Sequence, residues 1–299
     1  MFRIGLSIAM VFVGLACMNL RCMADHPDAS IASTENPVEV EHDIVYGTGG
    51  GIDLQLDLAR PIDRSVPSPC IVVIHGGAWR MGDKSNHRPD ITALAEQGYV
   101  AATIQYRFCP EHQFPAQVED VKCAVRYLRA HAEEYGIDPT RLGAVGYSAG
   151  AHLSMMLGTL DRQWEGDGGW PDQSSEVQAV VSYFGPTFFE EQGLNAQTKP
   201  LISDFLGGSA AEKPETYLQA SPLTHVSPGD APMLLFQGTD DALVPYQQAI
   251  LMVEAMTKAD IAGRVEFLID AKHGWGGETR DRTNRETHDF FDQHLRTGG

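Results

Sequence analysis

The chain has 299 residues, of which 43% are hydrophobic and 21% are charged, a composition typical of a globular protein rather than a disordered one. It carries 40 acidic against 22 basic residues. The resulting formal net charge of −18 argues against binding to nucleic acid or anionic lipid, because both need a basic surface. A neutral substrate fits this charge best.

The first 24 residues are typical of a targeting segment. A basic start at Met1–Arg3 precedes the uncharged apolar run 4–18, and Cys22-Met23-Ala24 supplies the small residues expected before a cleavage point. This run of 15 residues is short for a membrane span, which needs about 20. We expect a signal peptide at 1–24, a polar lead-in at 25–37, and bacterial secretion or periplasmic export with no membrane span afterwards. A retained anchor and lipoprotein processing at Cys17 stay open as alternatives.

After the lead-in, apolar runs of strand length alternate with stretches of helical period. Val38–Tyr46 and Ile52–Leu58 alternate polar and apolar residues, as half-buried antiparallel strands do. The later runs are almost continuously apolar, which is typical of strands covered by helices on both faces of a parallel sheet. These runs are Cys70–Ile74, Tyr99–Ile104, Leu142–Val145, Val177–Tyr183, Met233–Phe236 and Val265–Ile269.

Helical periodicity fills the spaces between these runs. The predicted helices are Ile91–Gln97, Ala116–Tyr135, Ala149–Thr159, Gln247–Lys258 and Asn284–Leu295. Such alternation predicts an α/β fold with a doubly wound, mostly parallel sheet whose first strands are antiparallel. Residues 161–175 and 186–228 break the alternation and are interpreted as insertions, the second as a small cap. We therefore expect one domain over 38–299.

The cysteines and the acidic loop 165–172 give no sign of a metal or another cofactor. After signal removal three cysteines are left, Cys70, Cys109 and Cys123, and no pair of them has metal-ligand spacing. Their apolar surroundings favour buried free thiols, although a disulfide is not excluded. Loop 165–172 clusters oxygen ligands but lacks the full spacing of a calcium site, so we interpret it as an exposed insertion.

A possible nucleophile stands between a predicted strand and a predicted helix. The five residues Gly146-Tyr147-Ser148-Ala149-Gly150 follow the run Leu142–Val145 and open the helix at Ala149. Small residues on both sides of Ser148 allow the sharp turn that holds a serine hydroxyl above the sheet. The pattern is weak alone, but its place between strand and helix makes Ser148 the candidate nucleophile.

Such a serine needs a histidine base and a carboxylate that orients the base, in the chain order serine, acid, histidine. Asp240 and Asp241 follow the strand Met233–Phe236, and we favour Asp241 because it lies at the turn just before Leu243-Val244-Pro245, where the end of a strand would direct it inward. His273 follows the last strand in a glycine-rich loop and is the candidate base. His152, His288 and His294 fall in predicted helices and are interpreted as packing or surface residues.

A glycine-rich loop that follows the strand Cys70–Ile74 could supply the oxyanion hole. Its sequence is His75-Gly76-Gly77-Ala78-Trp79, and consecutive small residues let backbone N–H groups face a cavity. We expect the N–H groups of Gly77, Ala78 and Ala149 to stabilise the oxyanion. His75 would brace the loop.

These motifs resemble those of the α/β-hydrolase fold, in the esterase/lipase group whose oxyanion loop reads His-Gly-Gly-x-Trp. Further matches run through residues 105–116, 119–121, 135–139, 184–186 and 221–222, and the similarity covers most of residues 40–298. Within the group the chain most resembles secreted acetyl-xylan and feruloyl esterases. It departs from the pattern at Ala78 and Ala151, where glycines are expected.

The resemblance implies a serine carboxylic-ester hydrolase that forms an acyl-enzyme on small acyl esters, such as acetyl or feruloyl esters of polysaccharides, without a cofactor or metal. The alternatives are an amide hydrolase, either an aryl-formamidase or a peptidase-like enzyme, and a non-catalytic binding protein. Trp79, Tyr147 and Trp275 are the expected pocket residues, with Trp170 as a weaker candidate. Acyl specificity, alcohol specificity and oligomeric state are not predicted.

Overall fold

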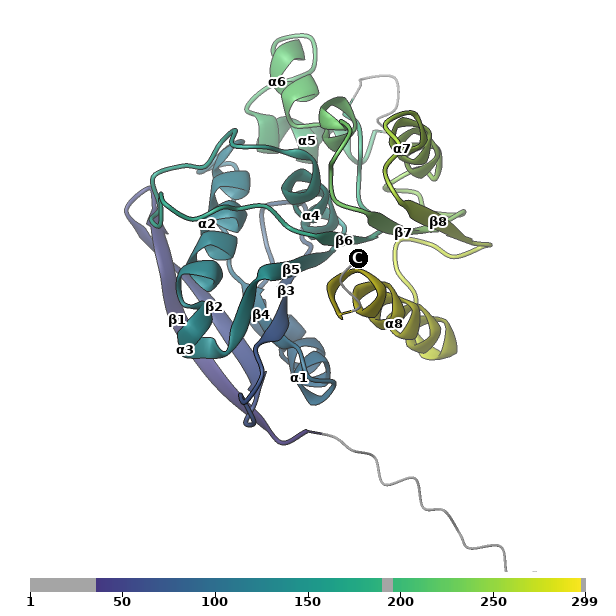
Figure 1. Ribbon diagram of the computed structural model, residues 1–299. Helices are drawn as coiled ribbons and strands as arrows, with labels where there is room; N and C mark the ends of the chain where they lie inside the picture. The colour runs from purple at the N-terminus through teal and green to yellow at the C-terminus, as the bar shows by residue number, and fades with distance from the viewer. Residues whose placement is uncertain (1–35, 190–195, 297–299) are drawn as a thin grey trace, which may run out of the picture. The chain divides into compact units, whose positions relative to one another are not determined.

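The protein is built around an eight-stranded sheet with the strand order β1-β2-β4-β3-β5-β6-β7-β8 (Figure 1). The computed structural model describes residues 36–189 and 196–296, so the predicted signal peptide and most of the lead-in lie outside the described residues. The strands are β1 (Val38–Gly49), β2 (Ile52–Pro61), β3 (Ser68–Ile74), β4 (Val100–Ile104), β5 (Ile137–Tyr147), β6 (Ala179–Tyr183), β7 (Met233–Gly238) and β8 (Gly263–Leu268).

Strand direction agrees with the predicted fold class. β1 pairs antiparallel with β2, and β2 pairs antiparallel with β4. All pairs from β4 through β3, β5, β6 and β7 to β8 are parallel. The α/β fold with a mostly parallel sheet and antiparallel first strands is therefore confirmed.

Helices cover both faces of the sheet and bury two apolar cores (Figure 1). Helices α1 (Arg88–Glu96) and α8 (Gly277–Phe291) cover one face. The other face is covered by α2 (Ala116–Ala130), α3 (Ala132–Tyr135), α4 (Ala149–Thr159) and α7 (Gln247–Lys258), and the short helices α5 (Lys199–Leu206) and α6 (Pro214–Gln219) pack into the same apolar core. Among the described helices, none is both long enough and apolar enough to cross a bilayer.

Two predicted helices differ from the observed ones. The predicted helix Ala116–Tyr135 is interrupted at His131, where the backbone has φ −103° and ψ 24°, and so divides into α2 and α3. The predicted helix Asn284–Leu295 begins seven residues earlier, at Gly277, and continues after Phe291 into a π-turn. The first turns of α8 carry polar residues, so apolar periodicity gives no sign of where this helix begins.

The segment 161–175 contains no helix or strand and is held against α2 by buried charge. The ammonium group of Lys122 is fully buried and donates to the carbonyl oxygens of Asp161 and Gln163, at 2.6 and 2.7 Å, and to Glu165 Oε1 at 3.0 Å. Arg126 also pairs with Glu165. A lysine nitrogen therefore lies among the oxygen atoms at the start of this loop.

The longer segment 186–228 folds back over the carboxyl ends of the strands. It contains α5, α6 and a 3₁₀ turn at Pro222–His225, while residues 190–195 lie outside the described part of the chain. Phe205 on α5 and Tyr217 on α6 are buried in the same core as α4. Helices α5 and α6 were not predicted because their six to eight residues are too short to show a clear period.

Cys70, Cys109 and Cys123 are buried free thiols, as their apolar surroundings predicted. Burial raises the pKa of the Cys70 thiol to about 12 and those of Cys109 and Cys123 to about 11. All three are therefore protonated and unreactive at neutral pH.

A buried carboxylate on β2 fixes the segment that follows the glycine-rich loop. Asp57 is fully buried and accepts hydrogen bonds from Lys84 Nζ at 2.7 Å, Arg88 Nε at 2.6 Å and the Asp43 N–H at 2.9 Å. Burial alone raises the pKa of Asp57, but these hydrogen bonds outweigh it and lower the pKa to about 2. Residues 84–88 are thereby anchored directly behind the loop 75–82.

Replacing this carboxylate should destabilise the protein in a pH-dependent way. Asp57→Asn removes the carboxylate partner of Arg88 and one of the two carboxylates that pair with Lys84, the other being Asp43, and we expect a loss of about 3 kcal/mol in the free energy of unfolding at pH 7. Because the folded-state pKa of Asp57 lies below its unfolded value of 3.8, its contribution is present above about pH 4 and is lost as the pH falls toward 2. The difference between the two proteins should therefore shrink at pH 2.5.

Urea unfolding at both pH values measures this effect, and Asp53→Asn is the matched control. Asp53 lies on the same strand, is exposed, and should change the free energy by less than about 0.5 kcal/mol. Equal losses in the two variants would contradict a stabilising role for the buried network.

Candidate active site

Ser148 lies on a sharp turn between β5 and α4. The turn requires glycine two residues before and two residues after Ser148, at Gly146 and Gly150. The Ser148 backbone has φ 54° and ψ −116°, an unusual conformation for a residue with a side chain. A Cβ atom on Gly146 would lie 2.1 Å from the Gly150 carbonyl oxygen, and one on Gly150 would lie 2.1 Å from that of Ile74. The two glycines therefore let α4 start directly against the end of β3, with the Ser148 hydroxyl at the edge of the sheet.

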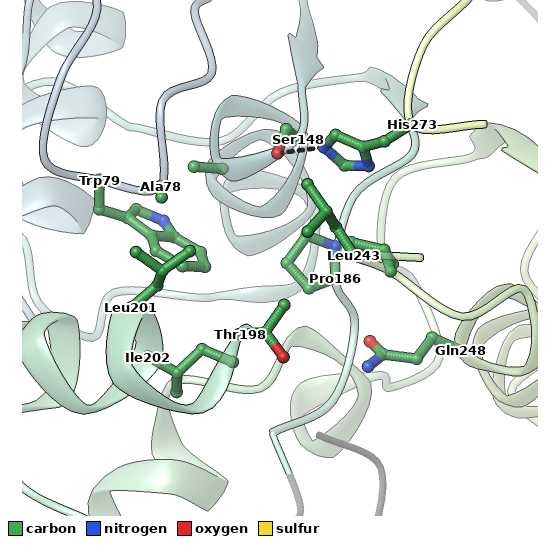
Figure 2. Close-up of a pocket in the computed structure, with 12 residues that line it drawn as sticks. Ala78, Trp79, Ser148, Pro186, Thr198, Leu201, Ile202, Leu243, Gln248 and His273 are labelled. Carbon is green, nitrogen blue, oxygen red and sulfur yellow. Dashed lines mark hydrogen bonds between the residues drawn. The ribbon is translucent and has the colours of Figure 1, made fainter. Parts of the chain in front are cut away.

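Ser148, His273 and Asp241 form a continuous chain of hydrogen bonds. His273 Nε2 lies 2.8 Å from Ser148 Oγ, and His273 Nδ1 lies 2.7 Å from Asp241 Oδ2 (Figure 2 shows the first of these contacts). A carboxylate only accepts hydrogen bonds, so the proton of the neutral imidazole is on Nδ1. Nε2 is therefore left to accept the proton of the Ser148 hydroxyl.

The Asp241 carboxylate is buried and its oxygen atoms are fully hydrogen-bonded. Oδ1 accepts from the N–H groups of Leu243 and Val244 at 2.8 and 2.9 Å, and Oδ2 also accepts from Gln237 Nε2 at 3.1 Å. Burial raises the pKa of Asp241, but the hydrogen bonds from His273 and the backbone outweigh it and bring the pKa below the usual range. Asp241 is therefore ionised when it contacts His273.

Of the two neighbouring aspartates, the structure brings Asp241 and not Asp240 to His273. Asp240 is exposed, and its N–H group donates to the Ala271 carbonyl at 2.9 Å. The other histidines considered from the sequence lie elsewhere. His152 lies on α4 and is buried, His288 lies on α8, and His294 lies in the short π-helix that follows α8.

The loop after β3 runs close to Ser148, because a Cβ atom on Gly76 would lie 3.3 Å from the Cβ atom of Ser148. Gly77 and Ala78 both have positive φ, +117° and +51°, so Ala78 adopts the left-handed conformation in which glycine was expected. Within the described residues, neither N–H group donates to another atom. The N–H group of Ala149 belongs to the first turn of α4, where backbone donors have no partner in the helix. Ala78 and Ala149 line the same pocket as Ser148, and Gly77 directly precedes Ala78.

His75 supports this loop from behind, as the sequence predicted. Its Nδ1 donates to the Gly76 carbonyl at 2.7 Å, and its ring stacks on Tyr106 with 4.4 Å between the ring centroids. Tyr106 Oη in turn donates to the His75 carbonyl at 3.0 Å. Burial lowers the pKa of His75 to about 4, so the ring stays neutral.

A small apolar pocket opens beside Ser148 and His273 (Figure 2). The cavity volume of this pocket is about 70 Å³. One wall is formed by the loop residues Ala78 and Trp79, and the facing walls come from the segment 186–228 and from the chain between β7 and the first turn of α7. The latter two contribute Thr198, Leu201, Ile202, Leu243, Val244 and Gln248.

Trp79 is the one predicted aromatic pocket residue that lines this pocket. Its ring stacks on Phe205 of α5 with 4.2 Å between centroids, and its Nε1 donates to His152 Nδ1 at 3.2 Å. His152 Nε2 donates to the Ala220 carbonyl at 2.7 Å. Trp79 is therefore held between the elbow helix and the inserted segment.

Tyr147 and Trp275 do not line this pocket, contrary to the expectation from the sequence. Tyr147 precedes Ser148 on the strand, so its side chain points to the other face of the sheet, where it stacks on Tyr183 and His87. Trp275 packs against Phe184 on that face and donates to Thr283. The weaker candidate, Trp170, donates to the Tyr46 carbonyl and packs against α2.

Several residues of the site could not be found from the sequence. Gln237 holds Asp241, but its only sequence feature is a place at the end of an apolar strand. The ring of Phe184 packs edge-on against His273 with 4.7 Å between centroids. Leu201 and Ile202 line the pocket from α5, and their only signal in the sequence is that they are adjacent apolar residues, whereas Gln248 has no such signal.

Comparison with known proteins adds to this geometry. The family model BD-FAE matches residues 56–256, more than half of the chain. The probable carboxylic ester hydrolase LipM of Mycobacterium tuberculosis is 34% identical over 215 residues, which cover 69% of this chain and 49% of LipM. Esterase LipC of the same organism is 31% identical, over 78% of this chain and 60% of LipC. The chain spans about half the length of the curated relatives it matches.

Two solved structures are similar over almost their whole length. A truncated form of a carbohydrate esterase from gut microbiota has a TM-score of 0.78 and 25% identity, covering 89% of this chain and 98% of its own. An esterase from the Planctomycetes species Thermogutta terrifontis, solved with propionate bound, has a TM-score of 0.72 and 27% identity, covering 89% and 96%. The same Thermogutta esterase has been solved phosphorylated by paraoxon.

The close contact at Gly150 predicts that even one methyl group disrupts the site. Gly150→Ala would push α4 away from β3, and we expect a loss of about 3 kcal/mol or more in the free energy of unfolding. Urea denaturation measures this loss. Gly276→Ala is the control, because Gly276 has φ −139° and open space around it, and as the N-cap of α8 it should cost only about 1 kcal/mol. A Gly150→Ala protein as stable as the control would contradict this account of the turn.

Proposed function

The chain belongs to the BD-FAE family, and we propose that it is a serine carboxylic-ester hydrolase that acts through an acyl-enzyme intermediate. The observation that carries the proposal is the hydrogen-bond chain from Asp241 through His273 to Ser148, beside free backbone donors and a pocket. The similarity to proteins named as esterases supports the same reaction.

In the first half of the reaction, Ser148 Oγ attacks the ester carbonyl carbon while His273 Nε2 takes the hydroxyl proton. The N–H groups of Gly77, Ala78 and Ala149 stabilise the negative charge that forms on the carbonyl oxygen. Each such donor is worth about 10²-fold or more in rate. His273 then gives its proton to the leaving alcohol, and the acyl group stays on Ser148.

In the second half, water attacks the acyl-enzyme with His273 as its base. The water proton moves to Nε2, the tetrahedral intermediate collapses, and His273 returns that proton to Ser148 Oγ as the acid product leaves. Asp241 keeps its charge throughout and stabilises the imidazolium that forms twice in each cycle.

We infer that the substrates are short acyl esters of polysaccharides, with acetyl as the acyl group. A cavity of about 70 Å³ has room for on the order of five water-sized groups. This size suits an acetyl or propionyl group better than the ring of a feruloyl group. A polymer does not fit in such a pocket, so the acyl part would enter it and the polysaccharide would stay in solvent. The net charge of −18 and the carbohydrate esterase of similar structure support a neutral glycan.

The sequence supports two further parts of this proposal. We infer that residues 38–299 act as one hydrolase domain, in which the segment 186–228 caps the pocket. The basic start and apolar run of residues 1–24 support export from a bacterial cell, where polysaccharide substrates would be met.

The nucleophile can be tested by removing one oxygen atom. Ser148→Ala should lower kcat for 4-nitrophenyl acetate by at least about 10⁴-fold, because the covalent step is lost. Ser154→Ala is the matched control: Ser154 is also buried in α4, and its hydroxyl donates only to the Gly150 carbonyl. Steady-state kinetics, with thermal melting to check the fold, measures both variants.

Retained turnover in folded Ser148→Ala would contradict the proposed nucleophile. A wild-type protein that hydrolyses no ester and resists a fluorophosphonate probe would instead indicate a binding protein on the same fold.

Acyl size should depend on Leu201, which is half-buried on α5 and lines the pocket. We expect the wild type to prefer 4-nitrophenyl acetate to the octanoate and to release acetate from acetylated xylan faster than ferulate from methyl ferulate. Leu201→Ala would open space, and the octanoate-to-acetate ratio of kcat/KM should rise about tenfold. Leu218→Ala is the control, because Leu218 is 50% exposed on α6 of the same segment. A wild type that prefers octanoate or ferulate would contradict the acetyl assignment.

A further inference from the structure

The pocket beside Ser148 ends on a polar side chain that the proposed reaction does not use. Gln248 lies in the first turn of α7 and is 6% exposed. Its carboxamide points into the pocket and faces Thr198 across it (Figure 2). Most of the surrounding wall is apolar, formed by Pro186, Leu243 and Val244.

Two backbone donors fix which way the Gln248 carboxamide points. The N–H groups of Thr187 and Phe188 lie 2.8 and 3.2 Å from Oε1, so this atom must be the oxygen. Thr187 Oγ1 also donates to the Gln248 carbonyl at 2.9 Å. The carboxamide therefore cannot flip without leaving two buried N–H groups without acceptors.

This orientation leaves both Nε2 hydrogens of Gln248 available to a ligand. No acceptor in the described part of the chain receives a hydrogen bond from Nε2. An aliphatic ligand group that displaced water from this donor would leave it without a partner, which is unfavourable, whereas a ligand atom that accepts from it keeps one hydrogen bond in apolar surroundings. A purely aliphatic acyl group would leave this donor unpaired.

We propose that, among short acyl groups longer than acetyl, the pocket favours those that carry a hydrogen-bond acceptor, such as a carbonyl or ether oxygen, on their chain. The inference rests on the proposed ester hydrolysis and specifies the acyl part of the substrate. With the acyl carbon bound to Ser148, its chain extends away from His273 into the pocket, and Gln248 Nε2 donates to the acceptor oxygen. Gln248 is thus a specificity-determining residue.

Pairs of esters that differ only by an ether oxygen test this role. 4-Nitrophenyl methoxyacetate is matched with the butyrate, and the 3-methoxypropionate with the pentanoate. In each pair an oxygen atom replaces a methylene group, and ether oxygen accepts hydrogen bonds without donating any. Each kcat/KM is divided by the hydroxide-catalysed rate of the same ester, which removes differences in intrinsic reactivity.

We expect the wild type to favour at least one ether ester over its aliphatic partner by about threefold to tenfold, the selectivity that one neutral hydrogen bond supplies. Gln248→Glu keeps an oxygen for the Thr187 and Phe188 N–H groups but removes both Nε2 hydrogens. This variant should lose the preference or reverse it.

The control is Gln178→Glu, which makes the same chemical change outside the pocket. Gln178 Oε1 also accepts a backbone N–H group, that of Leu142 at 2.9 Å, so loss of a merely structural hydrogen bond would be common to both variants. The control should keep the wild-type preference.

Equal normalised rates within both pairs for the wild type would overturn the inference, even if Gln248→Glu failed to fold. An ether preference that persists unchanged in folded Gln248→Glu would overturn it too. Both results leave ester hydrolysis intact. Failure of the proposed function is a different result, in which the wild type hydrolyses none of the esters, 4-nitrophenyl acetate included.

Discussion

The hydrogen bond between His273 Nε2 and Ser148 Oγ joins residues that are 125 positions apart in the sequence, and the site depends on it. The two residues meet because parallel strands end at the same edge of the sheet. At this edge Tyr147 pairs with Tyr183 of β6, Tyr183 with Phe236 of β7, and Gly238 with Leu268 of β8. Each loop after a strand therefore starts beside the next, so the register of the sheet sets the distances in the site.

Backbone strain gathers around this hydrogen bond. Ala78, Trp79, Ser148 and Phe184 all have positive φ without being glycine, and each contacts the pocket or the His273 ring. Such conformations cost on the order of 1–3 kcal/mol each, so the surrounding packing must hold them. Close glycine contacts and the buried ion pairs of residues 84–88 provide that support, which leaves the donors and the hydroxyl ordered before a substrate arrives.

The strands were predicted well because each has a strong local signal, and the candidate catalytic residues lie in motifs that the structure brings together. Apolar runs mark buried parallel strands, and the glycine spacing around Ser148 reflects a steric requirement. The preference for Asp241 over Asp240 rested on its place in a turn, and the structure brings that residue to His273. The polar first turns of α8 were missed because they bury little apolar surface.

The pocket was predicted poorly because its walls come from contacts that local sequence does not encode. Tyr147 and Trp275 are near Ser148 and His273 in the chain, but strand alternation and packing turn them to the other face. Leu201 and Gln248 reach the pocket only because α5 and α7 fold over the sheet edge. Local sequence motifs therefore indicated the candidate catalytic residues, whereas closeness in sequence to these residues did not indicate which side chains line the pocket.

The central claim is that the folded chain activates Ser148 above every other serine. Treatment with paraoxon followed by peptide mass spectrometry tests it most directly, because a serine activated by a base beside an oxyanion site is phosphorylated much faster than an ordinary hydroxyl. This account predicts one diethylphosphoryl group per chain, located on Ser148, with release of one equivalent of 4-nitrophenol and no labelling in urea. Labelling of a different residue, or no labelling of the folded protein, would contradict it.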